Sequence, residues 1–237
     1  MKQLISKVRA GIKNYKMIEE NDKIAVCISG GKDSIYLLYA LNEIKKYSKV
    51  NFEIIAIHAD PCFNNKNADL SQIEKFCKDN NIELIIKRTT LAKIIFEDKK
   101  ENNPCSLCSH MRRGILHDLA KVHGCNKIAL GHHLDDAIET FFLNLFNNGI
   151  ISCFSPNTYL SRKNIHMIRP LIFCEENKVI SEVKRLDLPF IKSDCPEDGK
   201  TERENIKILI KSLEEKYLDL KKKIFNVLKN LYKEKNI

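Results

Sequence analysis

The segment at 29–34, with the sequence SGGKDS, holds residue types that can bind phosphate. It follows an apolar run and precedes an amphipathic pattern, so we predict a turn between a strand and a helix N-terminus, where backbone amides and the helix dipole favour anions. Asp33 can hold a magnesium ion that bridges phosphate oxygens, and Lys32 offers a cation. Phosphate contacts are expected along the whole turn: Ser29, Gly30, Gly31, Lys32, Asp33 and Ser34. The spacing of a Walker A loop, GxxxxGK(S/T), does not occur in the sequence.

Two cysteines, Cys105 and Cys108, stand one helical turn apart at a predicted helix start. The helix dipole there is expected to lower the pKa of both thiols, which favours metal binding. A single CxxC motif fits half of a zinc site, a redox pair or part of an iron–sulfur site, and the sequence lacks the second CxxC of a four-cysteine zinc site. The spacing alone leaves these alternatives open.

Cys195 is predicted to lie in a loop between a short apolar stretch and the final helix, where it can reach the cysteine pair. It is the expected third ligand, although a thiol at the solvent edge without a function fits the same position. Three cysteines leave one iron of a cluster open to a small anion such as hydrosulfide. Three other cysteines lie in strand or helix patterns and are expected in the core: Cys27, Cys77 and Cys125.

A polar cluster, GHHLDD at 131–136, follows another predicted strand. In a parallel sheet the carboxyl ends of neighbouring strands share one edge, so Gly131 is expected beside the glycine turn. Asp135 and Asp136 suit magnesium binding or proton transfer there. A second interpretation gives the two acids no role beyond capping the next helix.

Strand and helix patterns alternate along the chain and predict the elements that hold these residues. Apolar runs predict strands at 23–29, 52–59, 82–87 and 126–130. Periodic patterns predict helices at 3–20, 35–41, 68–80, 106–123 and 135–147. The alternation indicates a Rossmann-like α/β fold, with a mostly parallel sheet and helices on both faces. Residues 148–170 are irregular and are expected to form a loop or a short hairpin across the sheet edge.

The C-terminal tail is predicted to form one long helix, opened by a capping box at Thr201 and Glu204. Its apolar stripe is expected to dock on the chain's own domain, with dimer formation or delivery of basic residues to RNA as alternatives. We therefore divide the chain into an N-terminal helix at 1–20, a nucleotide-binding domain at 21–195 and a helical extension at 196–237.

The composition fits one globular unit, because 237 residues with 43% hydrophobic content can bury a single sizeable core. No apolar run is long enough for a membrane span and the N-terminus lacks the apolar block of a secretory signal, so we predict a cytoplasmic protein. Nine cysteines in a reducing compartment favour free thiols over disulfides. The net charge of +9 suits a polyanion such as RNA, although a biased genome explains it equally well.

These motifs resemble known proteins at two levels. The strand, the SGGKDS turn and the helix resemble the pyrophosphate loop of the ATP pyrophosphatase superfamily, which implies ATP cleavage between the α and β phosphates and an adenylated intermediate. Four longer segments, within about residues 10–205, resemble the tRNA 2-thiocytidine synthetase family: MIEENDKIAVCISGGKDS, PCSLCSHMRRGIL, KIALGHHLDDAIETFFLNLF and IRPLIF. This resemblance implies a 4Fe-4S cluster on three cysteines, ATP with Mg²⁺, and thiolation of a cytidine in the tRNA anticodon loop.

The resemblance also implies roles for individual residues. The family's cluster ligands fall on Cys105, Cys108 and Cys195. Its nucleotide site falls on the SGGKDS turn, Asp60 and Gly131. Catalytic roles are implied for Lys32, Arg112, Asp135 and Asp136. Arg112 and Arg113 match a basic pair that faces the ATP phosphates or the substrate RNA.

In the implied reaction the base carbonyl attacks the α phosphate of ATP, and sulfide then displaces AMP from the same carbon, so no protein persulfide is needed. The sulfur donor is sulfide or sulfur derived from a cysteine desulfurase. The chain lacks the second CxxC-like sequence that many relatives carry after the position of Cys195, so uridine thiolases, desulfidases and lysidine-type ligases stay open. A non-catalytic RNA-binding protein that keeps ATP as a structural ligand is a further alternative.

Overall fold

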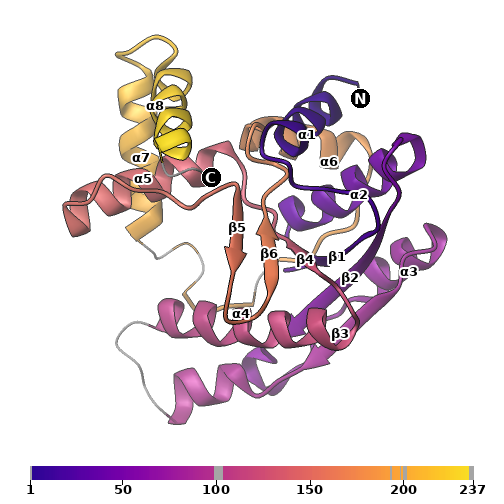
Figure 1. Cartoon of the computed structure of the whole chain (residues 1–237). Coiled ribbons are helices and arrows are strands. Elements are labelled where there is room, and N and C mark those ends of the chain that lie inside the picture. Colours follow the sequence, from indigo (N-terminus) through magenta and orange to yellow (C-terminus); the bar gives the residue numbers. More distant parts are fainter. Residues whose placement is uncertain (1, 99–103, 193, 198, 200–201, 235–237) are drawn as a thin grey trace.

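A computed structural model describes residues 2–98, 104–192, 194–197, 199 and 202–234. Its centre is a six-stranded sheet in the order β3-β2-β1-β4-β6-β5 (Figure 1). The strands are β1 (Asp22–Cys27), β2 (Phe52–Asp60), β3 (Leu84–Arg88), β4 (Lys127–Ala129), β5 (Asn157–Leu160) and β6 (Ile165–Ile168). Neighbouring strands are parallel except β5 and β6, which form an antiparallel hairpin at one edge. The predicted Rossmann-like fold class is confirmed.

Helices cover both faces of this sheet (Figure 1). They are α1 (Lys2–Asn14), α2 (Lys32–Tyr47), α3 (Ser71–Asp79), α4 (Pro104–Val122), α5 (Leu134–Asn148), α6 (Glu176–Arg185), α7 (Glu202–Glu214) and α8 (Leu220–Glu234), with the short turns η1 (Phe63–Asn65) and η2 (Lys93–Asp98). Side chains alternate along a strand, so β1 contributes to two layers. Ile24 and Val26 pack in the core that contains α2, whereas Ala25 and Cys27 pack with Leu116 of α4.

All four predicted strands are present, with ends within two residues of the predicted bounds. The irregular region at 148–170 contains the β5–β6 hairpin, and β6 extends the sheet beside β4. The opening helix ends at Asn14, earlier than predicted, because Lys16 takes a positive φ of 45° and turns the chain. α6 is missing from the predicted elements, although its buried residues Val179 and Val183 lie at helical spacing.

The prediction of a single long C-terminal helix is wrong. The chain forms two helices, α7 and α8, separated by a break at 215–219 that ends at Asp219 in the left-handed conformation, with a φ of 55°. Ile210 of α7 and Leu228 of α8 are buried in the main core, so the predicted docking on the chain's own domain is confirmed. Thr201 of the predicted capping box lies outside the described residues, and the division into three parts stays a prediction. Within the described ranges, every helix is too short or too polar to cross a membrane.

Candidate functional site

The SGGKDS turn connects β1 to α2, as predicted. Gly30 has a φ of 94°, which residues with a Cβ rarely adopt, and a Cβ there would lie 2.6 Å from Cγ1 of Ile191. The Ser34 hydroxyl accepts a hydrogen bond from the Ser29 amide at 3.1 Å and donates one to the Gly31 carbonyl at 2.8 Å. These contacts close the turn around the N-terminus of α2, where free backbone amides favour phosphate.

The segment that follows β4 touches this turn through Gly131. A Cβ at Gly131 would lie 3.0 Å from the amide nitrogen of Ser34 and 3.1 Å from the carbonyl carbon of Asp33. Both are backbone atoms in the first turn of α2, so they have little room to move. The two strand ends therefore meet as expected for neighbouring parallel strands, and only glycine permits this close approach.

Replacement of Gly131 by alanine is expected to weaken ATP binding, because the added methyl group displaces the backbone of the turn. Overpacking of this kind costs about 1–3 kcal/mol of stability. The part of this strain that moves the turn out of its binding geometry raises the Kd measured by calorimetry with a non-hydrolysable ATP analogue, by roughly 150-fold at most. Gly114 of α4 is the control, because a Cβ there meets no atom within 4 Å. Gly114→Ala should keep the ATP affinity and stabilise the protein by about 1 kcal/mol. Wild-type affinity in Gly131→Ala would contradict the close approach.

A cavity of about 300 Å³ lies beside the turn, at the ends of β1 and β2. We call it the first cavity, and its wall includes Ser29, Gly31, His58, Asp60, Phe63, Ala68, Arg112 and Ile191. Asp60, the predicted acidic position, is buried at the end of β2. Its two carboxylate oxygens accept hydrogen bonds from the amides of Cys62 and Ala68, each at 2.9 Å. Asp60 therefore shapes the cavity wall by holding the segment after β2.

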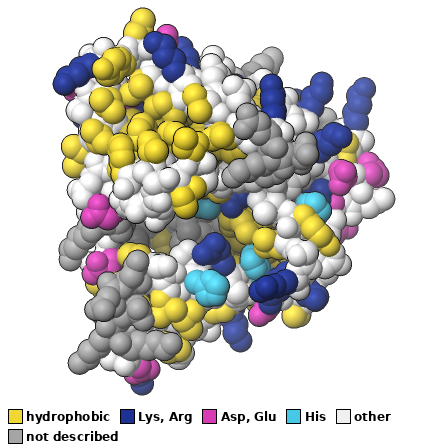
Figure 2. Space-filling model, turned by 60° about the vertical axis from the view of Figure 1, so that its left-hand side comes forward, with side chains coloured by type: hydrophobic (Ala, Val, Ile, Leu, Met, Phe, Trp, Pro, Cys, Tyr) yellow, Lys and Arg dark blue, Asp and Glu magenta, His cyan; other side chains and the backbone are white. Residues whose placement is uncertain are grey.

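A second cavity, of about 620 Å³, adjoins the first. Ser29, Phe63 and Arg112 belong to both walls, so a molecule bound along the turn can extend from one cavity into the other. Lysine, arginine and histidine side chains gather around a hollow on the face of the molecule that Figure 2 shows. Positive charge around a hollow favours an anionic substrate.

The three predicted cluster ligands line the second cavity: Cys105, Cys108 and Cys195. Asp33 and Ser34 of the turn belong to the same wall. Cys105 and Cys108 lie at the start of α4, whereas Cys195 belongs to the segment between α6 and α7. The fold thus brings thiols that are far apart in the sequence to one space beside the predicted nucleotide loop.

The two cysteines at the start of α4 have pKa values above that of an ordinary thiol. Burial raises the pKa of Cys105 and Cys108, and the nearby Cys195 adds to this effect. Arg112 acts in the opposite direction on Cys108, but burial dominates. The prediction that the helix dipole lowers these pKa values is therefore wrong. Metal binding at these thiols must release their protons, because thiolates are the ligands.

The donor set fits an iron–sulfur cluster better than a single metal ion. Among the described residues, no three His, Cys, Asp or Glu side chains converge closely enough to hold one ion. The cysteines of a cluster bind different iron atoms, so their sulfur atoms stand further apart than the ligands of one ion. Three thiols line one cavity, and thiolates are the soft ligands that such clusters select.

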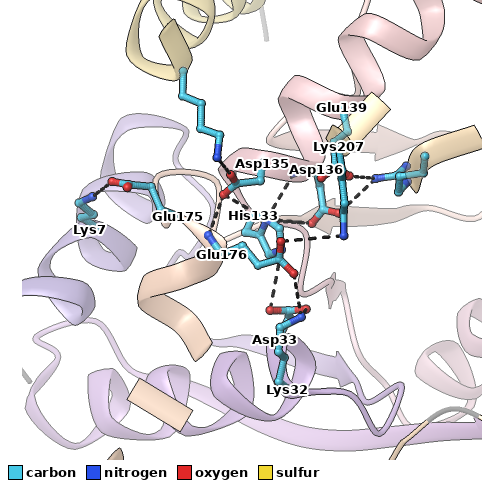
Figure 3. A network of polar contacts seen from close by, with 12 residues as sticks. Lys7, Lys32, Asp33, His133, Asp135, Asp136, Glu139, Glu175, Glu176 and Lys207 are labelled. Atoms are coloured by element: carbon cyan, nitrogen blue, oxygen red, sulfur yellow. Dashed lines mark hydrogen bonds and ion pairs between the residues drawn. The ribbon is translucent and has the colours of Figure 1, made fainter. Parts of the chain in front are cut away.

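Asp33 lies at the edge of a polar network between α2 and α5 (Figure 3). Its Oδ2 accepts a hydrogen bond from Lys32 at 3.2 Å, and its Oδ1 lies 3.8 Å from Nε2 of His133. Oδ1 is buried and has no hydrogen-bond partner in the described part of the chain. Burial raises the pKa of Asp33, against the charges of His133 and Lys32. A buried carboxylate oxygen without a partner, next to a phosphate-binding helix N-terminus, fits a Mg²⁺ ligand.

The two adjacent acids at the start of α5 point in different directions (Figure 3). Asp136 lines the second cavity, and its Oδ2 caps α5 by accepting a hydrogen bond from the His133 amide at 2.9 Å. Asp135 accepts a hydrogen bond from the Glu176 amide at 2.7 Å and pairs with Lys221 at 2.9 Å. It lines neither of the two cavities. The structure does not support the predicted catalytic role of Asp135, because these contacts commit its carboxylate to joining α5 with α6 and α8.

The two cations with predicted catalytic roles have different surroundings. Lys32 pairs with Glu176 at 3.0 Å and with Asp33 at 3.2 Å, and it lines neither cavity. Arg112 lines both cavities, whereas Arg113 lines only the second. Burial lowers the pKa of Arg112, although the nearby Cys108 opposes this effect. Arg112 is therefore placed to contact a nucleotide and a second substrate, and Lys32 is held by acids beside the turn.

The predicted site lacks His132 and Arg169, which also belong to the wall of the second cavity. Arg169 follows β6, and its guanidinium lies 4.7 Å from the centroid of the Phe154 ring. Its Nε donates a hydrogen bond to Nδ1 of His132 at 3.2 Å. The sequence signal is an arginine directly after a strand and before a proline, within the IRPLIF segment.

The cysteines predicted in the core are buried as expected: Cys27, Cys77 and Cys125. Cys27 also reaches the wall of the second cavity. Burial raises the pKa of Cys27 to about 12, so it stays a protonated thiol. This agrees with a packing role at the end of β1.

A comparison with protein families shows the family to which the chain belongs. A model described as the PP-loop domain matches residues 2–213. The chain belongs to the PP-loop family. A tRNA-cytidine(32) 2-sulfurtransferase from Syntrophotalea carbinolica is 35% identical over 93% of this chain and 85% of the relative. Another, from Francisella tularensis subsp. novicida, is 37% identical over 97% of this chain and 86% of the relative. The predicted resemblance to tRNA 2-thiocytidine synthetases is confirmed.

The chain is also similar to solved structures, and one of these likenesses extends over nearly its whole length. The U34-tRNA thiolase NcsA from Methanococcus maripaludis, with its 4Fe-4S cluster, has a TM-score of 0.80 and 28% identity to this chain. The match covers 98% of this chain and 78% of that chain. The likeness in fold therefore covers nearly the whole chain.

Proposed function

We propose that this PP-loop protein is an ATP-dependent tRNA sulfurtransferase that converts a cytidine of the anticodon loop to 2-thiocytidine. The main support is the second cavity, because three thiols and the SGGKDS turn line this one space of about 620 Å³. Relatives named tRNA-cytidine(32) 2-sulfurtransferase, at 35% and 37% identity, support the substrate. The likeness to a thiolase with a 4Fe-4S cluster supports the sulfur chemistry.

The reaction consists of two substitutions. The O2 oxygen of the base attacks the α phosphorus of ATP, the bond to the β-phosphate oxygen breaks, and pyrophosphate leaves. Sulfide then attacks C2 with its own electron pair, the C2–O bond breaks, and AMP leaves with the former base oxygen. Adenylation makes that oxygen part of a good leaving group. No oxidant or reductant is consumed, because sulfide supplies both electrons of the new bond.

The residues of the site have separate tasks. The SGGKDS turn binds the phosphates through backbone amides at the N-terminus of α2. Asp33 would hold Mg²⁺, which would offset phosphate charge. Arg112, which lines both cavities, stabilises negative charge on the α phosphate during transfer. Cys105, Cys108 and Cys195 would hold a 4Fe-4S cluster, which would supply the sulfide for the second substitution.

The proposed partners follow from this chemistry. Transfer RNA is a polyanion, and the net charge of +9 favours its binding. The sulfur donor is free sulfide or sulfur released by a cysteine desulfurase. A tRNA substrate places the enzyme in the cytoplasm.

A homodimer is a further part of the proposal. Exposed apolar side chains occur at the end of α5, in the segment after it and on α8: Phe146 (55% exposed), Ile150 (54%), Ile151 (61%) and Val227 (49%). A large apolar band lies above the hollow in Figure 2. Apolar surface of this kind favours association with a second copy. Sedimentation analysis that finds only a monomer at micromolar concentration would contradict it.

Mass spectrometry of tRNA nucleosides from cells with and without the gene tests the proposed function. Loss of 2-thiocytidine on deletion, with recovery when the wild-type gene returns, is the expected result. Loss of a thiouridine would favour the second candidate, uridine thiolation, which the likeness to a U34-tRNA thiolase supports. Unchanged levels of every thionucleoside would contradict both.

A further inference from the structure

His132 and Arg169 form a hydrogen-bonded pair in the wall of the second cavity. Arg169 is buried, and its Nη1 and Nη2 donate to the Ser155 carbonyl and to Sδ of Met167. Its Nε is aimed at Nδ1 of His132, 3.2 Å away. The His132 ring stacks on Phe154 with a centroid distance of 5.1 Å. Both side chains are therefore held in place by several contacts. The proposed reaction gives neither of them a role so far, because phosphate binding and cluster ligation are assigned to other residues.

The contact with Arg169 fixes the tautomer of His132. A guanidinium only donates hydrogen bonds, so Nδ1 of His132 must accept one and the ring proton must lie on Nε2. Burial and the charge of Arg169 lower the pKa of His132 to about 4, so the ring is neutral at neutral pH. Of the other groups that face it, Asp136 raises this pKa, whereas Arg203 and His133 lower it. His132 therefore offers a fixed N–H donor without a charge.

A base that reaches both the turn and the thiols must enter this cavity. Arginines in the wall suit phosphates, whereas a neutral N–H donor suits the edge of a base. Cytosine has a hydrogen-bond acceptor at N3, and uracil carries a hydrogen there. A fixed donor thus forms a hydrogen bond with N3 of cytosine. It cannot bond to N3 of uracil, because the two N–H groups would face and repel each other. Because N3 is bonded to C2, the same hydrogen bond draws electron density from the carbon that sulfide attacks.

We propose that His132, oriented by Arg169, donates an Nε2–H hydrogen bond to N3 of the target cytosine and thereby selects cytidine over uridine. The proposal rests on the proposed tRNA thiolation and adds the residue that determines its base specificity. His132 contacts the substrate, and Arg169 acts through His132 as a positioning residue.

Thiolation of two tRNA transcripts, with cytidine or uridine at the target position, tests this role with the cluster-loaded enzyme. His132→Phe keeps a ring against Phe154 but removes the donor, whereas His132→Gln keeps an N–H at a similar reach. His132→Phe is expected to lose about tenfold to hundredfold in kcat/KM for the cytidine transcript. The kcat/KM for the uridine transcript should stay as low as in the wild type, and the Kd for ATP should not change. His132→Gln should recover most of the lost kcat/KM for the cytidine transcript. An unchanged preference for cytidine in His132→Phe would overturn the proposal.

Nitrogen-15 NMR of the histidines provides a readout that does not depend on activity. His132 of the wild type should be neutral and protonated at Nε2 between about pH 5 and 8. Removal of the guanidinium in Arg169→Met should raise the pKa of His132, while Arg169→Lys, which keeps the charge and a donor, should keep it low. A proton on Nδ1 in the wild type would overturn the proposal.

The role of His132 and the sulfurtransferase function can be tested separately. A wild-type enzyme that thiolates both transcripts equally would overturn the role of His132 and leave the sulfurtransferase function intact. A wild-type enzyme that thiolates neither transcript, although it carries its cluster, would overturn the function and the role of His132 with it.

Discussion

Cys108→Ser is expected to abolish the iron–sulfur cluster and sulfur transfer together. The Cys108 thiol lines the cavity that Cys105, Cys195 and the SGGKDS turn also line, so its loss removes one of the three proposed cluster ligands. Thiolation should fall by more than about a hundredfold, since even partners that only support a ligand are worth 10- to 100-fold. Iron content and the visible absorbance after anaerobic purification measure the cluster, and mass spectrometry of tRNA nucleosides measures thiolation. Cys105→Ser and Cys195→Ser should behave in the same way.

Cys62→Ser is the matched control for this series. Cys62 is half-buried and lines neither cavity, and serine is close to cysteine in size. This variant should keep its iron and its activity. Cys108→Ser should still bind ATP, because the turn is intact, and this result separates loss of the cluster from loss of the fold. Wild-type thiolation by iron-free Cys108→Ser would contradict the assignment.

Asp33→Asn is expected to abolish tRNA-dependent release of pyrophosphate. The buried Oδ1 of Asp33 lacks a hydrogen-bond partner among the described residues, and an amide in its place binds Mg²⁺ poorly. Loss of a group that stabilises charge in the transition state typically costs on the order of 100- to 1,000-fold in kcat. A pyrophosphate-release assay over a range of Mg²⁺ concentrations measures the effect.

Asp79→Asn is the control for this charge change, because Asp79 is exposed at the end of α3 and lines neither cavity. It should retain activity within about twofold, as surface substitutions usually do. The cluster of Asp33→Asn should form normally, since its three ligands are unchanged. A rate and a Mg²⁺ dependence equal to those of the wild type would rule out Asp33 as the metal ligand.

Much of the fold was predictable because local patterns determine it. The apolar runs of β1 and β2 are buried on both faces, so they stand out as continuous stretches. The glycine turn combines a positive φ at Gly30 with a helix start, and both have a sequence signature. The position of Cys195 in a loop after an apolar stretch predicted that it can reach the cysteine pair, and the family resemblance then singled it out as the third ligand, because the three thiols come from segments that are far apart in the chain.

Other features depend on tertiary contacts that no local pattern reveals. Asp135 and Asp136 are identical in type and adjacent, yet only Asp136 faces the second cavity, because α5 turns the first acid toward Lys221. The apolar stripe of the tail continues across the break before Asp219, so periodicity alone does not separate α7 from α8. Arg169 belongs to the site through its contact with His132, 37 residues away in the sequence.

In the proposed reaction, the thiols and the nucleotide turn act on one base in one cavity. To test this, the cluster-loaded enzyme is incubated with tRNA, ATP and radiolabelled sulfide under anaerobic conditions. We expect label in 2-thiocytidine and one AMP formed for each sulfur incorporated, with neither product when ATP or the cluster is omitted. Sulfur incorporation without ATP, or AMP formation with no labelled nucleoside, would contradict the account.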